Sequence, residues 1–218
     1  MSEVSAVITV YNQRPYLGEA IESVLAQTYP VREIIVVDDG SDDKSIEVVR
    51  SYPGVIGEVT PRLGQSGAMN RGADLATAPW LAFLDGDDRW IRGKLERQLE
   101  IARETASDAI FGHATQFLDP AAGDLKVDLS PRPACLPSAM LIRASVYREL
   151  GGMNPELGPG AVLEFFGRLK HQGVKHLLAP DVVYERRVHG KNTAFLSPKL
   201  TQSYARALAT LRRRTSAT

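Results

Sequence analysis

A chain of 218 residues, 44% of them hydrophobic, is long enough to bury the core of one sizeable domain. Lys and Arg together number 26, and so do Asp and Glu, so the formal net charge is zero and no global basic field attracts nucleic acid. The single cysteine, Cys135, excludes an internal disulfide and a multi-cysteine zinc site.

This cysteine usage predicts a reducing, cytoplasmic location. The first residues, MSEVSAVITVYNQ, lack a basic segment and contain only a short apolar run, so they predict a first strand and not a secretion signal. No apolar stretch approaches the roughly 18 residues that a membrane-spanning helix needs.

Strands and helices are expected to alternate through the first half of the chain. The apolar, β-branched run from Val4 to Val10 predicts a buried strand, and apolar residues at helical spacing predict a helix over 16–27. The same patterns continue as strands over 34–37, 55–59 and 80–84 and helices over 44–52, 67–76 and 93–105. We expect Ser41 to cap the second helix. This alternation predicts an α/β fold, with a mostly parallel sheet and helices on both faces.

Polar residues follow three of these strands at the point where each strand ends. They are Tyr11-Asn12, Asp38-Asp39-Gly40-Ser41 and Asp85-Gly86-Asp87-Asp88. Ligands of parallel sheets bind beyond the carboxyl ends of the strands, so we expect these residues to line one rim.

Each of these groups has a ligand-binding and a structural interpretation. Carboxylates at Asp85 and Asp87 suit Mg²⁺ or Mn²⁺, which keep positions open for phosphate oxygens, but a solvated acidic turn is the alternative. Asp39 is able to accept a hydrogen bond from a base or a ribose, or to cap a helix. Tyr11 is able to stack on a base, or to be an ordinary aromatic residue at the rim.

The second half of the chain is less regular. Residues 119–137 are rich in Pro, Asp and Gly and predict a surface loop, followed by a strand over 138–143, a helix over 161–171 and a strand over 182–188. No repeat or linker divides the chain, so we expect a single domain over 1–218.

A final helix is expected over 199–214. Its apolar side chains fall on one face, namely Leu200, Tyr204, Ala207, Leu208 and Leu211. Arg212-Arg213-Arg214 follows. A docked terminal helix with a solvated basic end is the favoured interpretation, and peripheral contact with a membrane or a partner is the alternative.

Four runs of sequence resemble the family-2 glycosyltransferases of GT-A fold: VITVYNQRPYLGEAIESVLAQTYP, EIIVVDDGSDD, GQSGAMNRGADLATAPWLAFLDGDD and GGMNPELG. The resemblance implies transfer of a sugar from a nucleotide-diphosphate donor, usually a UDP-sugar, with inversion and with Mg²⁺ or Mn²⁺. It implies a nucleotide-binding half over about 1–115 and an acceptor half over about 116–193. The donor sugar and the acceptor are not specified.

The resemblance also implies roles for individual residues. Thr9 and Tyr11 would line the base pocket, and Asp39 would contact the base. Asp85 would face the ribose and the metal, and Asp87 would be the principal metal ligand.

The later run ERRVHGKN resembles the final strand of the family. This implies that His189 reaches the metal or the diphosphate, with Arg187 near by. A structural histidine is the alternative.

The sequence departs from the family after the GGMNPELG run. The family usually has an acidic pair there, whose second member is the catalytic base, and another acid two residues later. Ala161 and Val162 occupy the positions of the pair, and Glu164 matches the later acid. Neither Ala nor Val is able to take a proton. We therefore expect either that Glu164 is a replacement base or that the protein binds a donor with weak or lost catalysis.

Two other classes of enzyme fit less well. Phosphatases of the dehalogenase type also have Asp-x-Asp after a strand. Two residues after the second Asp, however, they have Thr or Val, where this chain has Arg89. Sugar nucleotidyltransferases want a Gly-rich, basic loop after the first strand, where this chain has Tyr-Asn-Gln-Arg-Pro.

Overall fold

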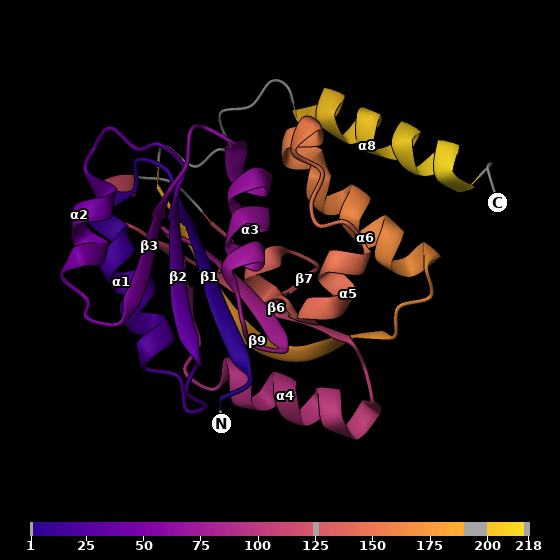
Figure 1. Ribbon diagram of the computed structural model, residues 1–218, viewed down its shortest axis with the longest axis horizontal. Coiled ribbons are helices and arrows are strands. Elements are labelled where there is room, and N and C mark those ends of the chain that lie inside the picture. Colours follow the sequence, from indigo (N-terminus) through magenta and orange to yellow (C-terminus); the bar gives the residue numbers. More distant parts are fainter. Residues whose placement is uncertain (1, 124–126, 190–199, 216–218) are drawn as a thin grey trace.

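A mixed sheet runs through the middle of the protein and carries helices on both faces (Figure 1). The computed structural model describes residues 2–123, 127–189 and 200–215. The predicted α/β class is confirmed. The strand order is β3-β2-β1-β4-β8-β6-β9-β5, and β7 pairs with β6.

Four parallel strands form the first half of the sheet. They are β1 (Val4–Val10), β2 (Glu33–Asp38), β3 (Val55–Val59) and β4 (Trp80–Asp85). Thr9 of β1 lies beside Val37 of β2 and Asp85 of β4 in the parallel register. The carboxyl ends of β1, β2 and β4 therefore lie at one edge of the sheet, as the sequence predicts.

The second half of the sheet adds antiparallel pairs. Its strands are β5 (Arg89–Trp90), β6 (Ala109–Leu118), β7 (Arg132–Ala134), β8 (Leu141–Arg143) and β9 (His176–Val188). β8 pairs antiparallel with both β4 and β6, while β6 and β9 run parallel. Because β5 pairs with β9, the end of β9 comes back beside the residues that follow β4.

Helices cover both faces of the sheet, so each face has its own apolar core. One face packs against α1 (Arg14–Leu25), α2 (Ser45–Arg50) and α4 (Lys94–Thr105). The other packs against α3 (Gly64–Leu75), α5 (Ala144–Glu149) and α6 (Ala161–His171). Ala6 and Ile8 of β1 belong to the first core and Val7 to the second, because successive side chains of a strand point to opposite faces. This two-sided burial explains why β1 is apolar throughout.

The last helix, α8 (Leu200–Thr215), packs on α6 and on the 3₁₀ segment η3 (Pro155–Gly160). The helix is present as predicted, but only part of its apolar face is docked. Ala207 is buried, whereas Tyr204 is 40% and Leu208 is 49% exposed. The side chains of Leu200 and Arg214 and residues 190–199 lie outside the described residues.

Several expectations for local structure were wrong. Ser41 does not cap α2, since the helix begins at Ser45 after Lys44, and the Ser41 hydroxyl accepts a hydrogen bond from the Asn12 N–H. The expected strand over 138–143 begins as a 3₁₀ turn, η2 (Pro137–Ala139), because Pro137 interrupts the strand pattern. The expected loop over 119–137 contains the 3₁₀ turn η1 (Pro120–Ala122) and strand β7. β6 and α5 were not foreseen.

A lysine is buried inside the first core. Lys94 begins α4 and is only 1% exposed. Its ammonium group donates to Gln98 Oε1 (2.5 Å) and to the Met140 carbonyl (3.3 Å), and it lies 4.9 Å from the centre of the Trp90 ring. Burial lowers the pKa of Lys94 to about 7. The charged form of this side chain therefore opposes folding at neutral pH.

Replacement of Lys94 by Met is expected to flatten the rise of stability with pH above pH 7. Because folding lowers the Lys94 pKa to about 7, the unfolded chain binds more protons between that pH and the lysine's usual pKa near 10.5. The unfolding free energy of the unmutated protein should therefore rise there, by at most about 1.4 kcal/mol per pH unit from this group. Urea denaturation across this range measures the slope. The exposed Lys175→Met is the control, and equal slopes for all three proteins would contradict the expectation.

Candidate functional site at the carboxyl edge of the sheet

The turn after β4 is hydrogen-bonded to the end of β1. The Gly86 N–H donates to the Thr9 carbonyl (2.9 Å), and the Asp39 N–H donates to the Val10 carbonyl (2.9 Å). A Cβ atom on Gly86 would lie 3.1 Å from the Thr9 carbonyl oxygen and 2.9 Å from Gln13 Oε1. A larger residue here would have to displace the Gln13 side chain and press on the Thr9 carbonyl, so the close approach of the turn to β1 favours glycine.

Asp39 is buried and fastens a neighbouring loop to the end of β2. Its carboxylate accepts hydrogen bonds from the N–H groups of Leu63 (2.6 Å) and Gly64 (2.8 Å) and from the hydroxyl of Thr60 (3.1 Å). The structure thus places Asp39 on the predicted rim and gives it a structural task there. Its contact with a base stays a prediction.

Tyr11 is 40% exposed at the same rim, next to the loop that Asp39 holds. The guanidinium carbon of Arg62 lies 3.3 Å from the centre of the Tyr11 ring. This is a close cation–π contact between a flexible side chain and the ring that the sequence assigns to base stacking. Arg62 was not foreseen as a neighbour of the site.

The acidic turn concentrates negative charge. Asp87 and Asp88 are buried, and the half-buried Asp85 accepts a hydrogen bond from Gln65 Nε2 (2.7 Å). Burial and the neighbouring Asp87 carboxylate raise the pKa of Asp85 to about 6. Burial and the carboxylates of Asp87 and Asp85 raise the pKa of Asp88 well above its usual value. Carboxylates crowded in this way favour a bound cation, because it neutralises their mutual repulsion.

His189 comes to this turn from the end of β9. Its Nε2 atom lies 3.0 Å from Asp87 Oδ2, and its ring stacks on Tyr16 of α1 with 5.0 Å between ring centres. The structure therefore brings together Asp87 and His189, which are 102 residues apart in the chain. Their role as metal ligands stays a prediction.

Arg187, two residues earlier on β9, joins the acidic turn to two other segments, α1 and the end of β6. Its backbone N–H donates to the Asp88 carboxylate (2.9 Å), and its Nε donates to the Asp87 carbonyl (2.9 Å). Its other nitrogens bond the carboxylates of Asp119 (3.0 Å) and Glu19. This buried side chain also has its guanidinium carbon 4.8 Å from the centre of the Tyr16 ring.

The sequence matches the family described as "Glycosyl transferase family 2" over residues 5–150, which is more than half of the chain. The chain belongs to glycosyltransferase family 2. The matched residues include β1, β2, β4 and the acidic turn, and so contain most of the rim.

Curated relatives carry glycosyltransferase names. An uncharacterised glycosyltransferase of Nostoc is 40% identical over 116 residues, which is 51% of this chain and 36% of that protein. Glycosyltransferase AglE of Haloferax volcanii is 27% identical over 199 residues, 83% of this chain and 65% of that protein. The family-2 chain thus spans only about a third of the length of the Nostoc protein.

Two solved structures of similar fold were found in complex with nucleotide-sugars. Residues 1–349 of TarS from S. aureus, in complex with UDP-GlcNAc, give a TM-score of 0.77 at 18% identity, over 97% of this chain and 65% of that one. The mannosyltransferase PcManGT of Pyrobaculum calidifontis, in complex with GDP-Man and Mn²⁺, gives 0.75 at 19% identity, over 97% and 64%. These matches confirm the predicted GT-A fold.

Glu164 lies away from solvent in the family-2 chain. It is 0% exposed in the first turn of α6, where its carboxylate pairs with Arg168 (2.8 Å). Arg168 also donates to the carbonyls of Leu150 and Gly152, so the pair fixes the chain that leads into α6. The role of Glu164 as a replacement base stays a prediction, but its position favours a structural role.

Several residues around the rim were not foreseen from sequence. Arg89 bonds both Glu19 (2.7 Å) and Glu185 (2.6 Å), and Glu19 is shared with Arg187. Burial alone would raise the pKa of Glu19, but the hydrogen bonds from Arg89 and Arg187 lower it overall. The charged run Glu185-Arg186-Arg187 in β9 was the available signal, although it does not reveal the partners.

Over the described ranges 2–123, 127–189 and 200–215, no group of three or more acidic, His or Cys side chains forms a ready-made metal site. In the same ranges no helix is long and apolar enough to cross a membrane.

Replacement of Arg187 by Met is expected to destabilise the protein far more than replacement of Arg89 by Met. The Arg187 side chain is 6% exposed, so its loss leaves the buried Asp119 carboxylate without this partner and should cost about 3 kcal/mol. The Arg89 side chain is 35% exposed, so its loss should cost about 1 kcal/mol or less. Urea denaturation measures both. Equal losses would show that the Arg187 contacts contribute no more than a surface ion pair.

Proposed function

We propose that this chain transfers a sugar from a nucleotide-diphosphate donor with the help of a divalent cation held at Asp85 and Asp87. The observation that carries the proposal is the acidic turn of a family-2 chain, placed beside the ends of β1 and β2. The structures of TarS with UDP-GlcNAc and of PcManGT with GDP-Man and Mn²⁺ support it by their fold.

The acidic turn fits a hard cation. Its oxygen donors are the kind that Mg²⁺ and Mn²⁺ prefer. Burial and the neighbouring Asp87 carboxylate raise the pKa of Asp85, and a bound cation would offset both penalties on its charged form. Asp87 would be the principal ligand, with His189 beside it, and Asp85 would face both metal and ribose. When bound, the cation would neutralise the diphosphate and stabilise it as a leaving group.

The base pocket would lie between β1 and the loop that Asp39 holds. Tyr11 would offer its ring face for stacking. Thr9 would line the same pocket, because it lies near the end of β1, between β2 and β4. Arg62 would have to leave its present position on Tyr11, or cover the far side of the base. UDP is the expected nucleotide.

The residues before about 115 would therefore bind the donor, and those over about 116–193 would receive the acceptor. Direct attack of an acceptor hydroxyl on the anomeric carbon would invert its configuration. The hydroxyl needs a base near the start of α6, where Ala161 is buried and Val162 is half-buried.

A second candidate function is donor binding with weak or lost catalysis. It is favoured by Ala161 and Val162 in the positions of the usual acidic pair, and by the burial of Glu164 against Arg168. Donor binding would be kept, because the acidic turn and the base pocket belong to other elements.

UDP should raise the melting temperature only when Mg²⁺ or Mn²⁺ is present, and Asp87→Asn should abolish that rise. Saturation at a hundred times the Kd adds about 2.7 kcal/mol of stability, which is roughly 5–10 °C for a chain of this size. Asp74→Asn, at an exposed acid on α3, is the control and should keep the response. Equal stabilisation by UDP with and without metal would contradict the cation site.

Val162→Asp should raise the rate of sugar transfer or of donor hydrolysis by about 10²–10⁴-fold, because a positioned base contributes that much. Val162→Asn is the matched control without a base, and the UDP affinity of each variant separates binding from chemistry. Glu164→Gln should leave the rate of the folded protein unchanged. A large loss of rate at constant UDP affinity in Glu164→Gln would instead identify Glu164 as the base.

A further inference from the structure

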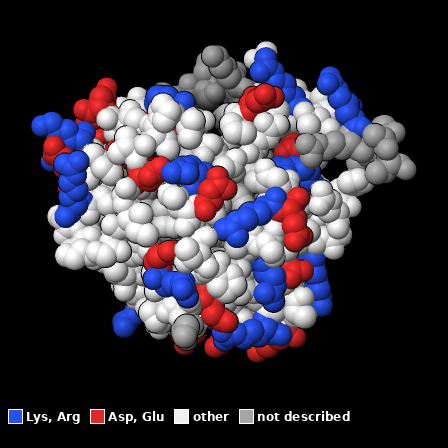
Figure 2. Space-filling view, in the orientation of Figure 1, with Lys and Arg blue, Asp and Glu red and all other residues white. Residues whose placement is uncertain are grey.

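The positive charge of the protein is unevenly placed. α8, with the sequence LTQSYARALATLRRRT, has four arginines and no acidic residue. The remaining chain therefore has 22 of the 26 basic residues against all 26 acidic ones. A protein with no net charge thus has one strongly basic helix on a body with a net charge of about −4. Figure 2 shows basic side chains along the edge of the molecule that α8 forms.

α8 is held against the rest of the protein by hydrogen bonds and by close packing. The Ser203 hydroxyl accepts from the Gly160 N–H (2.7 Å) and donates to the Leu157 carbonyl. A Cβ atom on Gly160 would lie 2.5 Å from the Ser203 carbonyl oxygen, and one on Gly167 would lie 2.5 Å from a Leu211 methyl group. The two glycines therefore allow the helix to pack closely on η3 and α6, and its outer side has a fixed direction.

The exposed side chains of α8 fall on two sides of the helix, because each residue turns about 100° around its axis. Tyr204, Leu208 and Arg212 follow one another along one side, and Arg206 and Arg213 lie on the other side, beside η3. Tyr204 and Leu208, one helical turn apart, are 40% and 49% exposed, and Arg206, Arg212 and Arg213 are exposed as well. With Arg212, Tyr204 and Leu208 form a short surface of apolar and basic side chains on a docked helix, a composition typical of helices that lie at a membrane surface.

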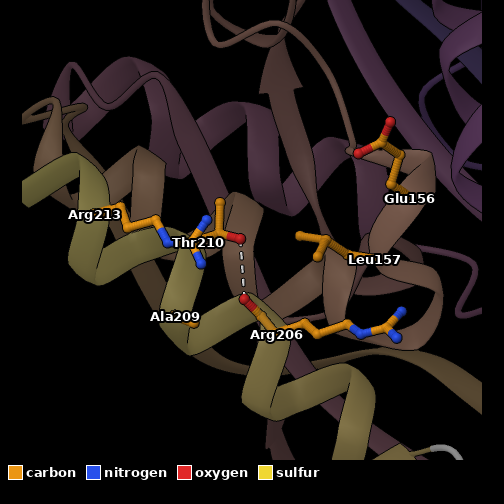
Figure 3. A pocket seen from close by; sticks show the side chains of 6 residues that line it. All are labelled: Glu156, Leu157, Arg206, Ala209, Thr210 and Arg213. Carbon is orange, nitrogen blue, oxygen red and sulfur yellow. Dashed lines mark hydrogen bonds between the residues drawn. The ribbon is translucent and has the colours of Figure 1, made fainter.

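A hollow of about 290 Å³ lies between α8 and η3. Figure 3 shows Arg206, Thr210 and Arg213 on the α8 side of it and Leu157 on the η3 side. The Glu156 carboxylate points away from the two guanidinium groups in this view. The lining of this hollow thus combines two arginines with the apolar Leu157 and the acidic Glu156. Arginine side chains are frequent partners of phosphate groups.

We propose that α8 docks on an anionic phospholipid bilayer, lying in the plane of the headgroups. Leu208 and Tyr204 would enter the boundary of the acyl chains, and Arg212, on the same side of the helix, would contact lipid phosphates beside them. Arg206 and Arg213 would reach phosphates from the other side of the helix, through their long side chains. The bilayer would attract α8 and repel the acidic remainder, so the charges also orient the molecule. Through η3 and α6, the proposed acceptor half would face the membrane.

Vesicle co-sedimentation of the full chain tests the proposal. Binding is expected to vesicles that contain about a third phosphatidylglycerol in phosphatidylcholine, to weaken in high salt, and to be absent with phosphatidylcholine alone. The variant with Arg206→Gln, Arg212→Gln and Arg213→Gln should bind on the order of 100-fold less, or about fivefold per arginine. Leu208→Glu should bind on the order of tenfold less.

The matched control removes two exposed arginines from α4, by Arg97→Gln and Arg103→Gln, and should bind vesicles as the unmutated protein does. Circular dichroism checks that each variant is folded. Equal binding to neutral and anionic vesicles, or full binding by the triple variant, would overturn the proposal. The proposal would also be overturned if the protein does not bind vesicles but forms a dimer that Leu208→Glu disrupts. The exposed surface of α8 would then be an interface with a second copy of the chain. None of these results depends on donor binding.

Discussion

Arg187 fixes the acidic turn to the end of β9, and the geometry of the site depends on this contact. The guanidinium group binds the Asp87 carbonyl and two carboxylates from distant segments, and the backbone of the same residue binds Asp88. Burial and the Asp87 and Asp85 carboxylates raise the pKa of Asp88, and the Arg187 N–H and the charge of Arg186 oppose part of that rise. The contacts of Arg187 leave the Asp87 side chain, with His189, at the rim.

The parallel register places the other half of the site. Thr9 lies between Val37 and Asp85, so the residues that follow β1, β2 and β4 come out at one edge. The helices contribute little chemistry there but cover both faces of the sheet, which lets its strands be apolar throughout. The ends of β1, β2 and β4 and the end of β9 thus meet at one edge, although they are far apart in sequence.

Sequence patterns predicted the parts that repeat with a simple period. β1 and the acidic turn were found because a continuous apolar run ends in polar residues. β6 was missed because Gly112 and His113 interrupt its pattern, where the pairing with β9 shifts register. The partners of Arg187 were not predictable, since they lie up to 168 residues away. Periodicity found the apolar stripe of α8, but the close approach at Gly160 and Gly167 decided which residues are covered.

The stack of Arg62 on Tyr11 has a consequence for any measured affinity. A base that takes that ring face does not fill bare surface, because it replaces a cation that is already there. The contribution of stacking to the observed binding free energy is then the stacking free energy of the base on Tyr11 minus that of Arg62. With a cation–π contact of about 0.5–1 kcal/mol at an exposed ring, the dissociation constant understates the contact of base with ring by about two- to fivefold. This cost would leave the selectivity among bases unchanged, since every base would displace the same arginine.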